Sequence, residues 1–146
     1  MAESDGSDLL LFDTHVWVWF VLGESSRVAR HIPAVLSAAS ETGRALLSVV
    51  SVWEAGRAIT RGRIPIRGTW DAWLTDAIAA VGGTVRPVDR AIAAASATLP
   101  ALEHGDPGDR LLIATARLTG ARLATADRAI LAYGAAGHVD VLDVRK

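Results

Sequence analysis

The chain has 146 residues, 51% of them hydrophobic, with no cysteine and a formal net charge of -1. A chain of this length suits a single domain, whose core can be stable without disulfides. The absence of cysteine excludes disulfides, thiolate metal sites and a cysteine nucleophile. The near-neutral charge argues against a protein that coats nucleic acid through bulk positive charge.

Neither a membrane span nor a secretory signal is expected. The densest apolar stretch, from Val16 to Leu22, is far shorter than the roughly 20 residues that cross a bilayer. The N-terminus, MAESDGSD, is acidic and lacks the basic and then apolar order of a secretory signal. We therefore expect a cytoplasmic protein with a disordered tail over residues 1–7 and one folded domain over residues 8–146.

Strand-like and helix-like segments alternate along the chain. Short apolar runs typical of buried parallel strands occur at residues 9–12, 45–50, 84–88, 122–125 and 139–142. Helical spacing and stop signals predict helices at residues 26–40, 51–60, 70–81, 89–99, 109–118 and 127–133. Residues 15–22 alternate ambiguously, with Gly23 a plausible helix end. The alternation predicts one α/β domain with a mostly parallel sheet of about four to five strands, flanked by helices.

Four acidic residues each fall where a strand-like run gives way to a helix-like one. They are Asp13, Glu54, Asp109 and Asp127. In a parallel α/β fold such junctions meet at one edge of the sheet, where ligands bind. Carboxylates gathered there would repel one another unless a cation lay between them. Oxygen ligands suit Mg²⁺ or Mn²⁺, and the four histidines lack the close pairing of a zinc site.

Helix capping offers a local explanation for most of these acids. Ser51 and Glu54 fit a capping box, with Ser51 at the N-cap and Glu54 three residues later. Asp106 fits the N-cap of the next helix pattern, with Asp109 in its first turn. Thr125 could cap the helix after it. Taken singly, each acid is explained as well by capping as by metal binding.

Asp13 differs from the other three acids because it directly follows an apolar strand and precedes no obvious cap pattern. Burying a carboxylate is costly unless the charge is solvated, hydrogen-bonded or paired with a metal. Capping and metal binding are also compatible, because a helix N-terminus keeps a carboxylate ionised, as a metal ligand must be.

The cations are unevenly distributed. All of them except the terminal Lys146 are arginines, and four fall in one short segment after the second acid: Arg57, Arg61, Arg63 and Arg67. Arginine makes bidentate contacts with phosphate, so this segment could bind a ligand that carries phosphate groups. A solvated helix face with an arginine bias is an equally open explanation. Trp70 and Trp73 lie nearby and could stack on bases, although helical spacing favours Trp73 as a core residue.

The four acidic segments together resemble the PIN-domain ribonucleases, in particular the VapC toxins of type II toxin–antitoxin pairs. The similar pieces are LLLFDTHVWVW, SVVSVWE, HGDPGDRLLIATA and LATADRAIL, in that order. Order, spacing and total length agree, and the resemblance runs from about residue 9 to residue 144. It implies that residues 8–146 form a PIN domain.

The resemblance also implies a site. Its catalytic and metal-binding acids would be Asp13, Glu54, Asp109 and Asp127, with Asp106 as a secondary candidate. Small hydroxyl residues would line the pocket, and these are Thr14, Ser51 and Thr125, which could equally cap helices. One or two Mg²⁺ ions, or Mn²⁺, would lower the pKa of a bound water that attacks a phosphodiester. The expected products carry a 5′-phosphate and a 3′-hydroxyl.

The implied substrate is tRNA, rRNA or mRNA, and the implied partners are a VapB-like antitoxin and a second copy of the chain. The apolar crowding of Trp17, Trp19 and Phe20 exceeds what one buried helix face requires, so we expect part of it to meet a partner. Other functions stay open: a PIN nuclease of RNA processing, or a catalytically silent PIN-like binding module. A phosphatase or receiver-like module fits less well, because His15 stands where an aspartyl phosphatase would carry a second Asp.

Overall fold

The structure is a computed structural model that describes residues 8–102 and 105–146. The expected tail at residues 1–7 and the loop residues 103–104, which include His104, lie outside the described residues. The strands are β1 (Leu10–Phe12), β2 (Ala45–Ser48), β3 (Val85–Arg86), β4 (Arg122–Thr125) and β5 (Val141–Asp143). The helices are α1 (Thr14–Leu22), α2 (Ile32–Glu41), α3 (Val49–Thr60), α4 (Trp70–Ala79), α5 (Arg90–Ala97), α6 (Pro107–Thr119) and α7 (Arg128–Ala135), with a 3-10 turn, η1, at Ser25–Arg27.

The five strands form one sheet in the order β3-β2-β1-β4-β5, and every neighbouring pair is parallel. The predicted fold class is confirmed. The chain builds outward from β1 to β2 and β3, then crosses back to place β4 and β5 on the other side of β1. Connections therefore leave β1 and β4 in opposite directions, which opens a crevice beyond the carboxyl ends of these two strands.

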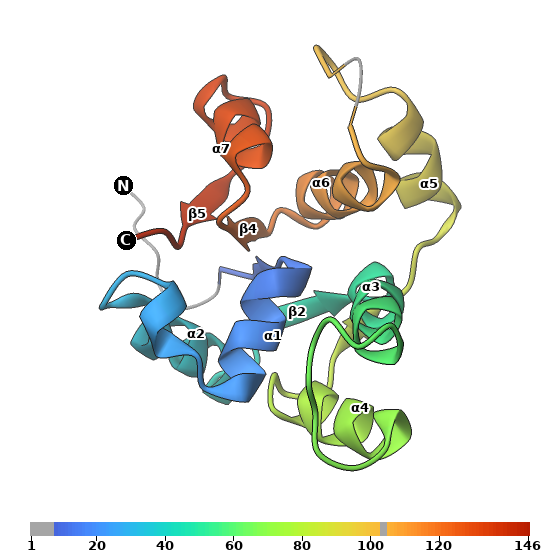
Figure 1. Ribbon diagram of the computed structural model, residues 1–146. Helices are drawn as coiled ribbons and strands as arrows, with labels where there is room; N and C mark the ends of the chain where they lie inside the picture. Colours follow the sequence, from blue (N-terminus) through green and yellow to red (C-terminus); the bar gives the residue numbers. More distant parts are fainter. Residues whose placement is uncertain (1–7, 103–104) are drawn as a thin grey trace.

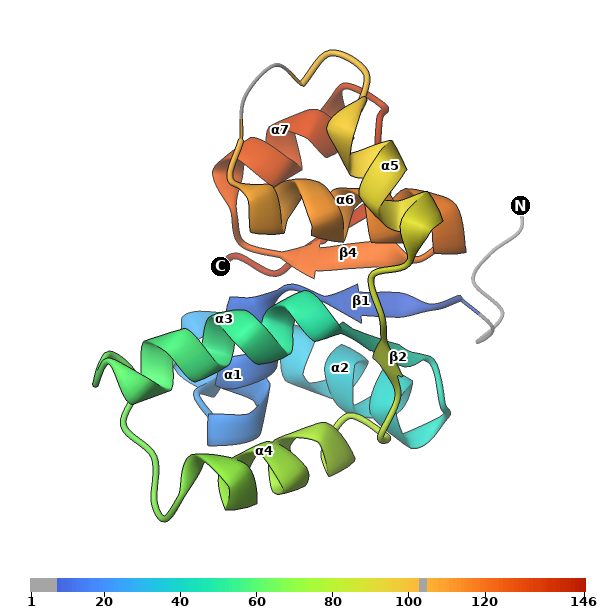
Figure 2. The same ribbon diagram turned by 90° about the vertical axis from the view of Figure 1, so that its right-hand side faces the viewer.

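Helices cover both faces of the sheet. Helices α5, α6 and α7 lie on one side, and α1, α2 and α4 lie on the other (Figures 1 and 2). Alternate side chains of β1 enter the two resulting cores: Leu10 and Phe12 face the α1–α2 side, and Leu11 faces the α6–α7 side. Because both of its faces are buried, the central strand β1 is continuously apolar rather than alternating.

Helix α3 begins earlier than the sequence predicts. The strand predicted at residues 45–50 ends at Ser48, and the β-branched Val49 and Val50 form the first helical turn instead. The Ser48 hydroxyl caps this helix by accepting a hydrogen bond from the Val50 N–H at 3.0 Å. The prediction that Ser51 is the N-cap is therefore wrong, and Ser51 lies inside the helix.

Helix α2 begins later than the sequence predicts. The helix expected from residue 26 starts at Ile32, after η1 and an extended Val28. Pro33 accounts for the shift, because proline is tolerated in the first turn of a helix but not in its interior. Gly23 ends α1 in the left-handed conformation, as expected for a C-cap glycine. None of the helices in the described ranges is long and apolar enough to cross a membrane.

Candidate active site

The four acids predicted at strand-to-helix junctions meet in one cavity of about 330 Å³. The junction prediction itself is correct for Asp13 and Asp127 but wrong for the other two, because Glu54 lies in the second turn of α3 and Asp109 in the first turn of a helix that follows α5. The cavity lies beyond the carboxyl ends of β1 and β4, where the order in which strands are added switches from one side of β1 to the other. The acidic residues that line it are Asp13, Glu54, Asp106, Asp109 and Asp127. Sequence reasoning expected this gathering because such junctions share one sheet edge.

Asp13 is held firmly at the end of β1. Its side chain is only 7% exposed, and its two carboxylate oxygens accept separate hydrogen bonds. Oδ1 accepts from the Thr14 N–H at 2.7 Å, and Oδ2 accepts from the Thr125 hydroxyl at 2.6 Å. Burial raises the pKa of Asp13, and these two hydrogen bonds oppose the rise. Asp13 also occupies the N-cap position of α1, which the sequence did not reveal.

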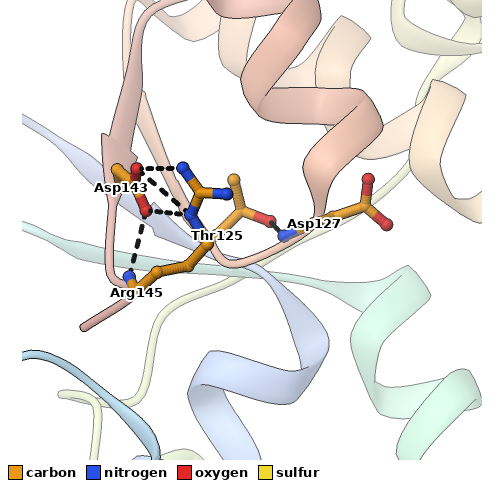
Figure 3. A network of polar contacts seen from close by, with 4 residues as sticks. All are labelled: Thr125, Asp127, Asp143 and Arg145. Atoms are coloured by element: carbon orange, nitrogen blue, oxygen red, sulfur yellow. Dashed lines mark hydrogen bonds and ion pairs between the residues drawn. The ribbon is translucent and has the colours of Figure 1, made fainter.

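Thr125 joins two of the acids across the crevice. While its hydroxyl donates to Asp13, it also accepts a hydrogen bond from the Asp127 N–H at 3.0 Å (Figure 3). The cap of α7 is Asp127 itself, whose Oδ1 accepts from the Ile130 N–H at 3.0 Å. The expectation that Thr125 caps this helix is therefore wrong, and Thr125 instead orients the acid at the end of the neighbouring strand. The pair Asp143 and Arg145 in Figure 3 is a separate surface contact.

Glu54 points from the second turn of α3 toward Asp13. Its Oε1 accepts a hydrogen bond from the Thr14 hydroxyl at 2.5 Å, and that hydroxyl lies 2.8 Å from the Ser51 hydroxyl. Ser51 is fully buried, so it supports Thr14 from inside the helix. Burial raises the pKa of Glu54, and the negative charges of Asp13 and Asp106 add to the rise.

Asp106 and Asp109 enter the cavity from the N-terminus of α6. Asp106 caps this helix as the sequence predicts, accepting from the Gly108 N–H at 2.7 Å and the Asp109 N–H at 3.4 Å. The Asp109 carboxylate is half-buried and accepts no hydrogen bond from any residue in the described ranges. Burial and the surrounding acids raise its pKa to about 7, so mutual repulsion is concentrated on this group.

Gly108 is a structural residue of the site that sequence reasoning missed. A Cβ atom at this position would lie 2.3 Å from Glu54 Oε2 and 3.0 Å from Asp106 Oδ1. The missing side chain therefore lets the first turn of α6 approach the Glu54 carboxylate. A glycine in the first turn of a helix is the signal that could have indicated such a close approach.

One of the four clustered arginines reaches the acidic cavity. Arg63 lines it together with His15, and its guanidinium group is exposed. Arg57 lies instead beside Trp53 on the outer face of α3, and Arg67 lines a separate groove near Trp73. The exposed Arg61 follows the last residue of α3.

The donor set suits a hard divalent cation, because it consists of carboxylate and hydroxyl oxygens. The raised pKa values of Asp13, Glu54 and Asp109 point in the same direction, because a cation would relieve the repulsion and desolvation behind them. In the part of the chain that the structure describes, no three acidic or histidine side chains are close enough to enclose one ion as they stand. Binding would therefore draw the carboxylates inward.

A family model for the PIN domain matches residues 10–136, which include all five cavity acids. The chain belongs to the PIN domain family. The resemblance drawn from the four acidic segments is thereby confirmed. The acids of this PIN domain lie beyond the carboxyl ends of β1 and β4, where the order of strand addition switches sides.

The PIN domain is related to the VapC ribonucleases. It is 30% identical over 125 residues to ribonuclease VapC22 of Mycobacterium tuberculosis, a match that covers 85% of this chain and 91% of the relative. This relationship supports nuclease activity.

Solved structures share the fold. VapBC2 from Rickettsia felis, bound to a DNA fragment from its promoter, matches with a TM-score of 0.67 and 10% identity, over 93% of this chain and 98% of that one. FitAcB from Neisseria gonorrhoeae matches with a TM-score of 0.62 and 19% identity, over 92% and 97% of the two chains. At these identities the likeness concerns the fold alone.

Proposed function

We propose that this PIN domain is a Mg²⁺-dependent endoribonuclease that hydrolyses phosphodiester bonds, with Asp13, Glu54, Asp109 and Asp127 as its metal-binding acids. The observation that carries the proposal is the cavity in which these four carboxylates and Asp106 meet. So much negative charge cannot approach a phosphodiester unless a cation lies between them. Relationship to a ribonuclease of the VapC type supports RNA as the substrate.

A bound Mg²⁺ or Mn²⁺ ion would lower the pKa of a water molecule and neutralise charge on the phosphate. The protein contributes orientation. Thr125 and the Thr14 N–H hold the two oxygens of Asp13, while the Thr14 hydroxyl holds Glu54. These hydrogen bonds keep the ligand oxygens in place before substrate arrives, so little reorganisation is needed during the reaction.

Arg63 is placed to contact the substrate phosphate. It lines the same cavity as the acids, on the connection between α3 and α4, and its guanidinium can donate two parallel hydrogen bonds to phosphate oxygens. Arg57, Arg61 and Arg67 lie outside this cavity, so any contact of theirs would be with RNA further from the cleaved bond.

Cleavage of single-stranded RNA by the full chain tests the proposal. We expect cleavage with millimolar Mg²⁺, none with EDTA, and products that carry a 5′-phosphate and a 3′-hydroxyl, because water attacks phosphorus and the 3′ oxygen leaves. Cleavage that persists in EDTA would contradict the proposal. Products with a 2′,3′-cyclic phosphate would also contradict it, because they arise from attack by the RNA 2′-hydroxyl.

We further propose that the enzyme is the toxin of a toxin–antitoxin pair and that it acts in the cytoplasm on tRNA, rRNA or mRNA. We also propose that it forms a homodimer and binds a VapB-like antitoxin. Of the crowded aromatics, Trp17 is fully buried, but Trp19 and Phe20 are half-buried and line a cavity of about 190 Å³ between α1 and α2. The accessible apolar surface of Trp19 and Phe20 suits contact with a protein partner. Expression in a bacterium should arrest growth, and co-expression of a small protein encoded directly upstream should relieve the arrest.

A further inference from the structure

The outer face of α3 carries an exposed tryptophan directly beside a site acid. Trp53 is 66% exposed and precedes Glu54 in the chain. The other exposed large hydrophobic residues in the described ranges reach only 37% (Leu22), 41% (Val49) and 52% (Leu118). Successive helical residues are rotated by about 100°, so Trp53 lies on the helix face next to the one that carries Glu54 into the cavity. An indole displayed this openly beside an active site suits a ligand with a flat apolar face.

An arginine, Arg57, lies directly beside Trp53. The Arg57 guanidinium lies over the Trp53 ring, with its central carbon 5.9 Å from the ring centre, within the range of a cation–π contact. Glu54 is the only acid in α3, and its carboxylate is directed into the cavity. Arg61 follows at the end of the helix, and Arg63 lines the acidic cavity. An exposed ring beside arginines complements the bases and phosphates of a nucleic acid.

Trp53 also borders a groove of about 400 Å³ between α3 and α4. Its floor is Trp70, which packs against Gly56 so closely that a Cβ there would lie 2.9 Å from Trp70 Cζ2. Trp70 in turn stacks on the buried Trp73, with ring centres 5.8 Å apart. The base-stacking role considered for Trp73 therefore does not suit it, because its ring is buried, and the half-buried Trp70 is less accessible than Trp53.

We propose that Trp53 stacks on a base of single-stranded RNA next to the cleaved bond, while Arg57 contacts the adjoining phosphate. The inference rests on the proposed ribonuclease function and assigns it a substrate-binding residue. RNA is favoured over a protein occupant because the face continues directly from Glu54 and because the charged side chain beside Trp53 is an arginine. Stacking of this kind tolerates any base, so it strengthens binding without selecting a sequence.

The test compares Trp53→Ala and Trp53→Phe with Leu118→Ala, which removes another exposed apolar side chain from a different helix. Binding of a ten-nucleotide single-stranded RNA is measured with Ca²⁺ in place of Mg²⁺, and KM and kcat are measured with Mg²⁺. We expect Trp53→Ala to raise Kd and KM about 5- to 100-fold with kcat unchanged, while Trp53→Phe stays within about threefold of wild type. Leu118→Ala should behave as wild type.

A second arm reports on the base itself. Replacing single nucleotides of the RNA by abasic ones should weaken binding to wild type at one position and should not weaken binding to Trp53→Ala further there. Unchanged Kd and KM in Trp53→Ala, with cleavage intact, would overturn the inference and leave the ribonuclease function standing. Dissociation of a dimer by Trp53→Ala in sedimentation would also overturn it, because a second copy would then cover this face. A wild-type chain that neither binds nor cleaves RNA would overturn both proposals.

Discussion

The two sides of the acidic cavity are organised differently. On the strand side, Asp13 is buried and receives hydrogen bonds from Thr14 and Thr125 on both of its oxygens. On the helix side, Asp109 is half-buried, accepts no hydrogen bond in the described ranges, and has a pKa raised to about 7. One carboxylate is therefore positioned by hydrogen bonds, whereas the other has its charged form destabilised by burial and by the neighbouring acids.

If the site binds a metal ion as proposed, this difference would allow it to be ordered by hydrogen bonds and still gain stability when a cation relieves the repulsion among its carboxylates. A fully hydrogen-bonded set of carboxylates would gain little from an ion, and a fully unsatisfied set would destabilise the fold. Dividing the two properties between β1 and the N-terminus of α6 gives a rigid ligand on one side and unrelieved repulsion on the other.

The largest expected effect is the loss of RNA cleavage when the charge of Asp13, on the strand side of the cavity, is removed. Asp13→Asn keeps an oxygen that can accept from Thr125 but removes the charge, so we expect the fold to persist and RNA cleavage to fall about a thousandfold. Cleavage rates and circular dichroism measured together check both parts. Asp143→Asn is the matched control, because Asp143 is exposed, pairs with Arg145 and does not line the cavity. Equal activity of Asp13→Asn and wild type would remove Asp13 from the site.

The next effect concerns the cation. Because an ion would relieve the repulsion around Asp109, saturating Mg²⁺ should raise Tm by about 5 to 10 °C, equivalent to roughly 2 to 3 kcal/mol at a hundred times Kd. Thermal melts with EDTA and with millimolar Mg²⁺ measure the shift. Asp109→Asn should lose most of it. Identical melting temperatures in the two buffers would argue against a metal centre.

Loss of the Thr125 hydroxyl should reduce cleavage by a smaller factor, because this hydroxyl positions Asp13. Thr125→Val removes the hydroxyl that donates to Asp13 Oδ2 while keeping the shape of the side chain, so we expect cleavage to fall about 10- to 100-fold. Thr125→Ser retains the hydroxyl and should recover most of the activity. A Thr125→Val enzyme with unchanged kcat and unchanged Mg²⁺ affinity would mean that this hydrogen bond does not position the acid.

The smallest expected effect is the pH dependence of stability in EDTA. The folded-state pKa of Asp109 is raised from 3.8 to about 7, so the folded state holds a proton that the unfolded state has released. Stability should therefore be full below about pH 4 and decline as pH rises through 7. After allowance for the exposure of Asp109, the loss is about 1 to 2 kcal/mol. Urea unfolding at pH 5 and pH 8 measures it, and Asp109→Asn should flatten the slope.

Local sequence patterns predicted the order of strands and helices and placed Asp13 and Asp127 correctly at strand-to-helix junctions, whereas Glu54 lies in the second turn of α3 and Asp109 in a helix that follows α5. Both inferences rest on apolar periodicity, which is carried by neighbouring residues. The capping residues were harder to predict. Ser48 and Ser51 are equally good caps by sequence, and the choice depends on where pairing with β1 and β3 ends β2. Since such pairing joins distant segments, no local pattern contains it.

The positions of the arginines and tryptophans around the site also depend on contacts between distant segments. By sequence, Arg57 and Arg63 are alike, but the turn after α3 brings only Arg63 into the cavity. Among the tryptophans, the sequence does not single out Trp53, yet it is the exposed one. Its exposure follows from Glu54 and Ala55 facing inward, which is decided by packing against α1 and α6.

Direct metal binding tests the central claim, that the four acids predicted at junctions form one metal centre. Mn²⁺ titrated into the full chain at pH 7.5 can be followed by the paramagnetic resonance signal of the free ion. We expect one or two ions per chain to bind in wild type, with binding weakened at least tenfold in Asp13→Asn and in Asp109→Asn but not in Asp143→Asn. Equal Mn²⁺ binding by all four proteins would contradict the claim.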